Sequence, residues 1–216
     1  MGRVNAELAA DWVGCLMAQK LGIASPDVEI ADVSGEALMT APGEVRSWAE
    51  PGPAFASLQI IGSVAAQSDS QLLEFATPDN IGMMFALDVW LEVLDRKKPD
   101  GIWNALVHTS DGGLRVIDFG KCLSPCFFPI LGSKVDQPVP NYPLAVRRSG
   151  SIQAALEVAS RIETMAADDI KEIVTSIPAR WIDEEVRQRI ADFLVDRSLH
   201  LGPVCAQMHE RDPKWT

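Results

Sequence analysis

Three oxygen-bearing side chains stand near the middle of this 216-residue chain, in the stretch LDRKKPDGIWNALVHTSDGGLRVIDFG. Asp95 follows an apolar segment with helical periodicity, Asn104 precedes a short β-like run, and Asp118 ends the next such run. A hairpin over these two runs would bring Asn104 and Asp118 to one end. Phosphoryl transfer needs Mg²⁺ at the phosphates, for which carboxylate and amide oxygens are suitable ligands, and a carboxylate that orients the attacking hydroxyl. The stretch therefore predicts Asn104 and Asp118 as metal ligands and Asp95 as the catalytic carboxylate.

The order Asp, Asn, Asp is also the order found in a kinase catalytic loop and its D-F-G motif. Asp118, Phe119 and Gly120 match that motif letter for letter. The loop departs from the pattern, because eight residues separate Asp95 from Asn104 where protein kinases place four, and no His precedes Asp95-Arg96. A lone D-F-G is a weak signal, and the order of all three residues around a hairpin makes it stronger.

Simpler interpretations of these residues stay open. Asp95 and Asp118 could cap turns at the ends of elements, and Asn104 could be a turn residue. Lys97 and Lys98 could neutralise a γ-phosphate, although adjacent lysines in a charged loop are more often only solvated.

The elements that must position these residues follow from periodicity and turn chemistry. Apolar residues at helical spacing predict a helix over 5–21, with Asn5 as its N-cap and Gly22 as its stop. Short β-like runs follow at 28–33, 37–40 and 55–62. A second helix with a broad apolar face is predicted to start near Thr77 and to run to about residue 94.

The hairpin and the C-terminal part complete the predicted fold. The SDGG sequence at 110–113 favours a tight turn between ALVHT and LRVID. From residue 151 onward the pattern is entirely helical, with a stop predicted at Gly202 and Pro203. Together with the kinase-like order of Asp95, Asn104 and Asp118, these elements predict an α+β, protein-kinase-like fold with an incomplete small lobe over 1–66 and a mainly helical lobe over 67–216.

Composition excludes several classes of function. The net charge of −11 and the pI near 4.7 make nucleic acid and anionic membranes poor partners. No apolar run reaches the roughly 18 residues of a membrane span, and the N-terminus lacks the pattern of a signal peptide, so we expect a cytoplasmic protein. The four cysteines do not form a disulfide or zinc pattern.

Several segments resemble the HipA-like kinase family. LDVWLEVLDR resembles that family's aromatic-bearing helix running into Asp-Arg, and Asn-Ala-Leu at 104–106 and RVIDFG resemble the motifs that follow it. The opening NAELAADWVGCLMAQKLGIASPDVEIADV is similar to the family's Asn-x-Glu helix, Leu-Gly and Pro-led strand, and IPARWIDEEVRQRIADFLVDRSLHL is similar to its closing helices. The resemblance covers most of the chain, and the family's variable Asp-to-Asn loop would account for the longer spacing.

The resemblance implies transfer of phosphate from ATP, with Mg²⁺, to a Ser or Thr hydroxyl of a protein. In that scheme Asp95 orients the hydroxyl, and Asn104 and Asp118 hold the metal. Glu7 would be the helix carboxylate that pairs with a lysine on an earlier strand. Lys97 is our further candidate for contact with the nucleotide.

The same resemblance places that lysine strand, and the loop that covers the phosphates, upstream of Met1. We therefore expect impaired catalysis or, as the alternative, a non-catalytic pseudokinase-like module that acts through protein contacts. A small lobe without those strands would leave an open sheet edge and an apolar patch beside the helix over 5–21. Homo-oligomerisation through that face is the expected consequence.

Overall fold

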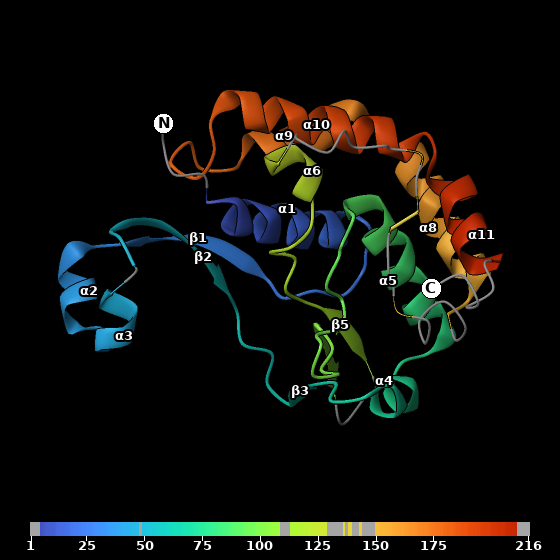
Figure 1. Cartoon of the computed structure of the whole chain (residues 1–216), viewed down its shortest axis with the longest axis horizontal. Coiled ribbons are helices and arrows are strands. Elements are labelled where there is room, and N and C mark those ends of the chain that lie inside the picture. Colours follow the sequence, from blue (N-terminus) through green and yellow to red (C-terminus); the bar gives the residue numbers. More distant parts are fainter. Residues whose placement is uncertain are drawn as a thin grey trace.

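The computed structural model describes residues 5–47, 49–108, 113–128, 136, 138–139, 143 and 150–210 (Figure 1). Helices make up most of it, and two small antiparallel sheets lie toward the N-terminal side and the centre. The α+β prediction is confirmed. No helix within these described ranges is both long enough and apolar enough to cross a bilayer.

The small lobe consists of one helix and a two-stranded ribbon. Its elements in chain order are α1 (Ala6–Lys20), β1 (Val28–Val33), α2 (Gly35–Thr40), α3 (Gly43–Arg46) and β2 (Gly52–Ser57). Every residue of β1 has an antiparallel partner in β2. In Figure 1 the ribbon leads away from α1 and carries α2 and α3 at its far end.

Two local predictions in this lobe have different outcomes. Gly22 follows the end of α1 with a left-handed φ of 69°, as expected for a helix stop. The β-like prediction for 37–40 is wrong, because this segment lies in α2. The hydroxyl of Ser34 accepts a hydrogen bond from the N–H of Ala37 at 3.0 Å, and this N-cap starts a helix that β-like composition does not reveal.

The exposed large apolar side chains of this lobe lie on the ribbon segment and just after it, not on α1. They are Ile30, Met39, Leu58 and Ile61. Helix α1 is largely buried by the rest of the chain, and its exposed residues are polar. Homo-oligomerisation through this lobe stays a prediction.

A three-stranded sheet forms the centre of the molecule. Its order is β3 (Ser63–Ala65), β4 (Ala105–His108) and β5 (Leu114–Val116), all antiparallel. The predicted hairpin is therefore present as β4 and β5, and the turn residues 109–112 lie outside the described residues. Strand β3 belongs to the predicted small-lobe range 1–66 but pairs with β4 of the large lobe.

Two helices pack against this sheet. Helix α4 (Asp69–Phe75) leads into α5 (Pro78–Leu91), which begins where the hydroxyl of Thr77 accepts the N–H of Asn80. Ten of the fourteen residues of α5 are buried, which makes this helix the centre of the large-lobe core. The short helix α6 (Ser124–Phe127) follows the D-F-G segment.

Within residues 152–210 the structure has four helices, in agreement with the helical pattern predicted for this part of the sequence. They are α8 (Ile152–Glu163), α9 (Ala167–Thr175), α10 (Glu184–Ser198) and α11 (Leu201–Glu210). The predicted stop at Gly202 and Pro203 is wrong, because both residues lie in the first turn of α11. Proline is tolerated there, since the first N–H groups of a helix have no intrahelical partner.

The segment between α9 and α10 fastens the small lobe to the large one. The indole N–H of Trp12 in α1 donates to the hydroxyl of Ser176 at 2.8 Å. The indole N–H of Trp181 donates to the carbonyl of Pro53 in β2 at 2.8 Å, and the carbonyl of Trp181 accepts the N–H of Asn5. Helix α1 and strand β2 are thus both hydrogen-bonded to the segment that joins α9 to α10.

Gly82→Ala should lower the free energy of unfolding by about 1–3 kcal/mol, although alanine usually favours a helix. A Cβ at position 82 of α5 would lie 2.2 Å from the carbonyl oxygen of Ser151, which is backbone and must shift α8. Urea unfolding measures the change. Gly43→Ala in α3 meets no atom closer than 3.9 Å and serves as the control. Equal stability of both variants would contradict this packing.

Candidate active site

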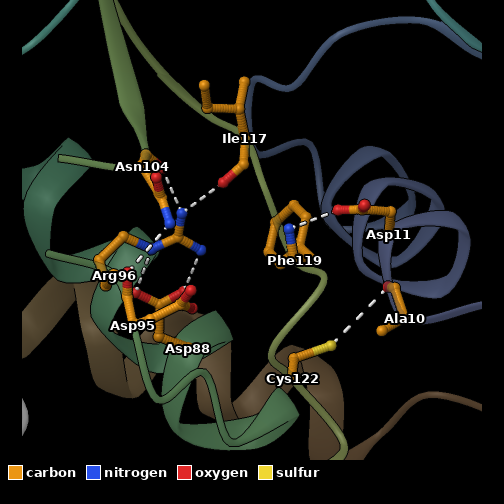
Figure 2. Close-up of polar contacts among 9 residues, drawn as sticks. All are labelled: Ala10, Asp11, Asp88, Asp95, Arg96, Asn104, Ile117, Phe119 and Cys122. Atoms are coloured by element: carbon orange, nitrogen blue, oxygen red, sulfur yellow. Dashed lines mark hydrogen bonds and ion pairs between the residues drawn. The ribbon is translucent and has the colours of Figure 1, made fainter. Parts of the chain in front are cut away.

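A buried ion pair lies under the predicted catalytic loop (Figure 2). Arg96 is 1% exposed and Asp88 of α5 is 0% exposed. The guanidinium donates from Nε to Asp88 Oδ2 at 2.8 Å and from Nη2 to Asp88 Oδ1 at 2.7 Å. Its Nη1 donates to the carbonyl oxygen of Asn104 and to that of Ile117 at 2.7 Å. One side chain thus joins α5, the loop, the start of β4 and the end of β5.

Asp95 and Asn104 meet despite the eight residues between them. The carboxamide of Asn104 donates from Nδ2 to the carbonyl oxygen of Asp95 at 3.0 Å, and the backbone N–H of Asn104 donates to the carbonyl of Arg96 at 2.9 Å. The intervening residues form a loop whose two sides are paired. Lys97 and Trp103 form an isolated antiparallel β-bridge, and the N–H of Lys98 donates to the carbonyl of Ile102. The longer loop therefore keeps its ends together.

Asp118 adopts a backbone conformation that is rare for a residue with a side chain. Its φ is 58°, in the left-handed region, and such a conformation usually costs on the order of 1–3 kcal/mol and persists only where the surroundings enforce it. It lies two residues after β5, and Asn104 lies directly before β4. Because β4 and β5 are antiparallel, both residues lie at the open end of the hairpin.

The contacts of Phe119, the next residue, help to hold Asp118 in this conformation. The side chain of Phe119 is fully buried, and Arg96 lies over its ring at 5.0 Å from the centroid. On its other side it packs against Gly14 of α1, where a Cβ would lie 2.2 Å from the ring. The backbone N–H of Phe119 donates to Asp11 Oδ1 at 2.6 Å. Helix α1 therefore fixes the segment that carries Asp118.

Burial and mutual repulsion raise the pKa values of two carboxyls here. Burial is the main reason that the pKa of Asp11 rises to about 6; the N–H of Phe119 opposes the rise, and the charge of Asp118 adds to it. Burial, followed by the charge of Asp118, raises the pKa of Asp95, while Arg96 and Lys121 lower it. Asp95 Oδ1 is buried and accepts no hydrogen bond from the described residues. Such an orphaned oxygen commonly marks a place where a ligand binds.

The remaining predicted residues lie at the edge of this cluster. Glu7 is exposed, and its carboxylate pairs with Lys121 at 3.3 Å. Lys97 pairs with Asp69 of α4 at 2.6 Å and lies over the ring of Trp103. The structure thus places Asn104 beside Asp95, places Asn104 and Asp118 at the same end of the hairpin, and directs Lys97 to α4.

Asp11 was not predicted as a site residue, and Lys98 was considered only together with Lys97. Asp11 faces the D-F-G segment, one turn of α1 after Glu7, and a carboxylate between the apolar residues Ala10 and Trp12 was the available signal. The ammonium of Lys98 lies 3.6 Å from Asp118 Oδ2. The sequence gives no basis for choosing between Lys97 and Lys98 as the residue that lies at the site.

A cavity of about 460 Å³ opens beside Asp118. Residues from both lobes line it, among them Phe55, Leu58, Leu106, Ile117 and Asp11. Its size and mixed apolar and acidic lining are typical of a small-molecule site. The lining residues come from α1, β2 and the segment after it, β3, β4 and the D-F-G segment, so the cavity lies between the lobes.

The side-chain oxygens at this end of the cavity are suitable ligands for Mg²⁺. The described residues contain no cluster of three or more His, Cys, Asp or Glu side chains that could enclose a metal by themselves. Magnesium is usually bound by one or two protein oxygens together with substrate phosphates and water. Asp118, which lines the cavity with its side chain 40% exposed, fits that mode, and Asn104, which is buried, lies at the same end of the hairpin.

The fold and this arrangement define a kinase-type protein, and the chain belongs to the HipA-like kinase family, whose sequence model matches residues 2–201. Among solved structures it is similar to the crystal structure of the Helicobacter pylori proinflammatory kinase CtkA, with a TM-score of 0.58 and 13% identity over 94% of this chain and 86% of that chain. At this identity the likeness shows the fold alone, and it confirms the predicted kinase-like architecture. No curated protein matches the chain significantly.

Asp88→Ala should lower the free energy of unfolding by about 3–5 kcal/mol, because it leaves the buried charge of Arg96 without its partner. Glu185→Ala is the matched control, since its ion pair with Arg189 lies at the surface and contributes less than about 1 kcal/mol. Urea unfolding of both variants measures the difference. A loss as small as the control's would show that Arg96 is not anchored by Asp88.

Asp11→Asn should stabilise the chain above pH 6 relative to the wild type. The raised pKa of Asp11 means that the wild type loses stability as the pH rises from about 4 to 6, on the order of 2–3 kcal/mol, and an amide has no such loss. Chemical denaturation between pH 4 and 8 tests this, with Glu7→Gln as the control on the exposed face. A stability difference that does not change with pH would contradict the burial of a charged Asp11.

Proposed function

We propose that the chain transfers the γ-phosphoryl group of ATP, with Mg²⁺, to a Ser or Thr hydroxyl of a protein. The observation that carries this proposal is the meeting of Asp95, Asn104 and Asp118 at the open end of the β4–β5 hairpin, beside a cavity between the lobes. Family membership supports a kinase-type reaction, and the protein acceptor follows from the resemblance to HipA-like kinases.

In this proposal the cavity receives the nucleotide with its phosphates toward Asp118. The oxygens of Asp118 and Asn104 would hold Mg²⁺, which neutralises charge on the phosphate oxygens when it is bound. The left-handed backbone of Asp118 and the buried ring of Phe119 keep that carboxylate in place before the nucleotide arrives. A preorganised carboxylate does not need to reorient during the reaction.

Asp95 acts on the acceptor in the same proposal. Its carboxylate accepts a hydrogen bond from the hydroxyl and then its proton, while the hydroxyl oxygen forms a bond to the γ-phosphorus. The bond between that phosphorus and the bridging oxygen of ADP breaks, so the products are a phosphoester and ADP. The raised pKa of Asp95 brings this carboxylate closer to the pH at which a base works well.

Phosphotransfer and nucleotide binding are the tests. Asp95→Asn should lower kcat by about 100-fold or more with little change in the binding of Mg-ATP, since Asp95 acts on the hydroxyl. Asp118→Ala should weaken Mg-dependent binding of ATP as well. Because the base must be deprotonated, the rate should fall as the pH drops through the raised pKa of Asp95.

Radiolabel transfer and calorimetric titration with Mg-ATP provide the measurements. Asp168→Asn in α9, with its side chain 96% exposed, is the control for the loss of one carboxylate. Transfer that survives Asp95→Asn would overturn the assigned base. Binding of Mg-ATP without any transfer would favour the non-catalytic alternative, and no Mg-dependent binding would overturn the proposal.

A further inference from the structure

Two consecutive lysines of the catalytic loop point to different partners. Lys97 forms a short ion pair with Asp69, at 2.6 Å, and lies 5.6 Å from the centroid of the Trp103 ring. Lys98 instead reaches Asp118 Oδ2, at 3.6 Å. The first lysine therefore serves the junction with α4, and the second lies at the proposed metal ligand.

The backbone of Lys98 is held firmly. Its N–H donates to the carbonyl of Ile102 at 2.8 Å, and its carbonyl accepts the N–H of Gly101 at 2.9 Å. Gly101 has a φ of 92°, which a residue with a side chain rarely adopts, so the tight turn depends on glycine. At the base of the turn, Trp103 is buried, and its backbone N–H donates to the carbonyl of Ala66 at 2.8 Å.

The side chain of Lys98 keeps freedom that its backbone lacks. It is 45% exposed, and its separation of 3.6 Å from the carboxylate is longer than that of the Lys97 pair. An exposed ion pair of this kind contributes little and exchanges partners readily. The ammonium can therefore move by a short distance without any change in the loop.

The charge balance of the site favours such a move toward phosphate. Burial is the main cause of the raised pKa values of Asp11 and Asp95, and the charge of Asp118 adds to both, so the three carboxylates repel one another. A nucleotide triphosphate adds further negative charge at the same end. Among the cations described around it, Arg96 is committed to Asp88 and to two carbonyls, and Lys121 forms an exposed pair with Glu7, whereas the ammonium of Lys98 already lies at Asp118.

We propose that Lys98 is a phosphate-contacting residue that acts as the counter-ion of Asp118 in the free protein and turns to the terminal phosphate when a Mg-nucleotide binds. Two cations at one carboxylate repel each other, so occupation of Asp118 by Mg²⁺ releases the ammonium. Its fixed backbone then leaves it within reach of the transferring group, where a positive charge stabilises the transition state. This inference rests on the proposed function and deepens it.

Calorimetry with Mg²⁺ alone and with Mg-tripolyphosphate tests Lys98 without the phosphotransfer reaction. Lys98→Ala should bind Mg²⁺ alone about 2- to 5-fold more tightly, because a competing cation is gone. It should bind Mg-tripolyphosphate about 10-fold more weakly or worse, because a charge-assisted contact is lost. Lys98→Arg should restore most of the binding. A lysine that only stabilises the loop would not produce opposite changes for the two probes.

Lys97→Ala is the discriminating variant, since the sequence alone made Lys97 the candidate. Lys171→Ala in α9 is the control for the loss of an exposed lysine, and circular dichroism verifies the fold of each variant. A larger loss of tripolyphosphate binding in Lys97→Ala than in Lys98→Ala would overturn the inference, as would equal binding by Lys98→Ala and wild type.

The kinase proposal and the Lys98 inference fail in different ways. A chain that transfers no phosphate but binds Mg-tripolyphosphate in a Lys98-dependent manner would refute the reaction and support Lys98 as the phosphate contact. A chain that transfers phosphate equally well in Lys98→Ala and wild type would support the reaction and overturn the role of Lys98.

Discussion

The guanidinium of Arg96 is the single group on which the geometry of the candidate site depends. A charge buried to 1% exposure is tolerated only with a counter-charge and filled hydrogen bonds, and Asp88 together with two strand carbonyls provides them. Since those carbonyls belong to the residues beside β4 and β5, the ion pair determines how the loop meets the hairpin. Asp95 and Asn104 therefore lie side by side although eight residues separate them in the sequence.

Much of this arrangement could be predicted because it is local. Alternation and turn residues predicted the hairpin, and its antiparallel register placed Asn104 and Asp118 at one end. The helix before Asp95 followed from its apolar periodicity and from the cap at Thr77. Local patterns of this kind involve only residues that are close together in the sequence, so one sequence is enough to predict them.

The parts that could not be predicted depend on contacts between distant segments. Asp11 becomes a site residue only because the N–H of Phe119, 108 positions later, donates to it. Lys97 and Lys98 are adjacent and chemically identical. Their side chains nevertheless reach different carboxylates, Asp69 and Asp118, because the β-bridge of Lys97 to Trp103 fixes the loop. The start of α11 at Leu201 was also not predicted, because a glycine and a proline near residue 200 predict a stop as readily as a first turn.

The site is finally connected to the far end of the chain through α1. Phe119 can hold Asp118 in its left-handed conformation only while Gly14 presents a surface without a side chain to the ring. The position of α1 in turn depends on the segment between α9 and α10, through the bond from Trp12 to Ser176. Helix α1 therefore cannot move independently of the large lobe, and the orientation of the D-F-G segment is a property of the whole folded chain rather than of its own sequence. We infer that the C-terminal helices support the position of Asp118 through this series of packing contacts, without touching it themselves.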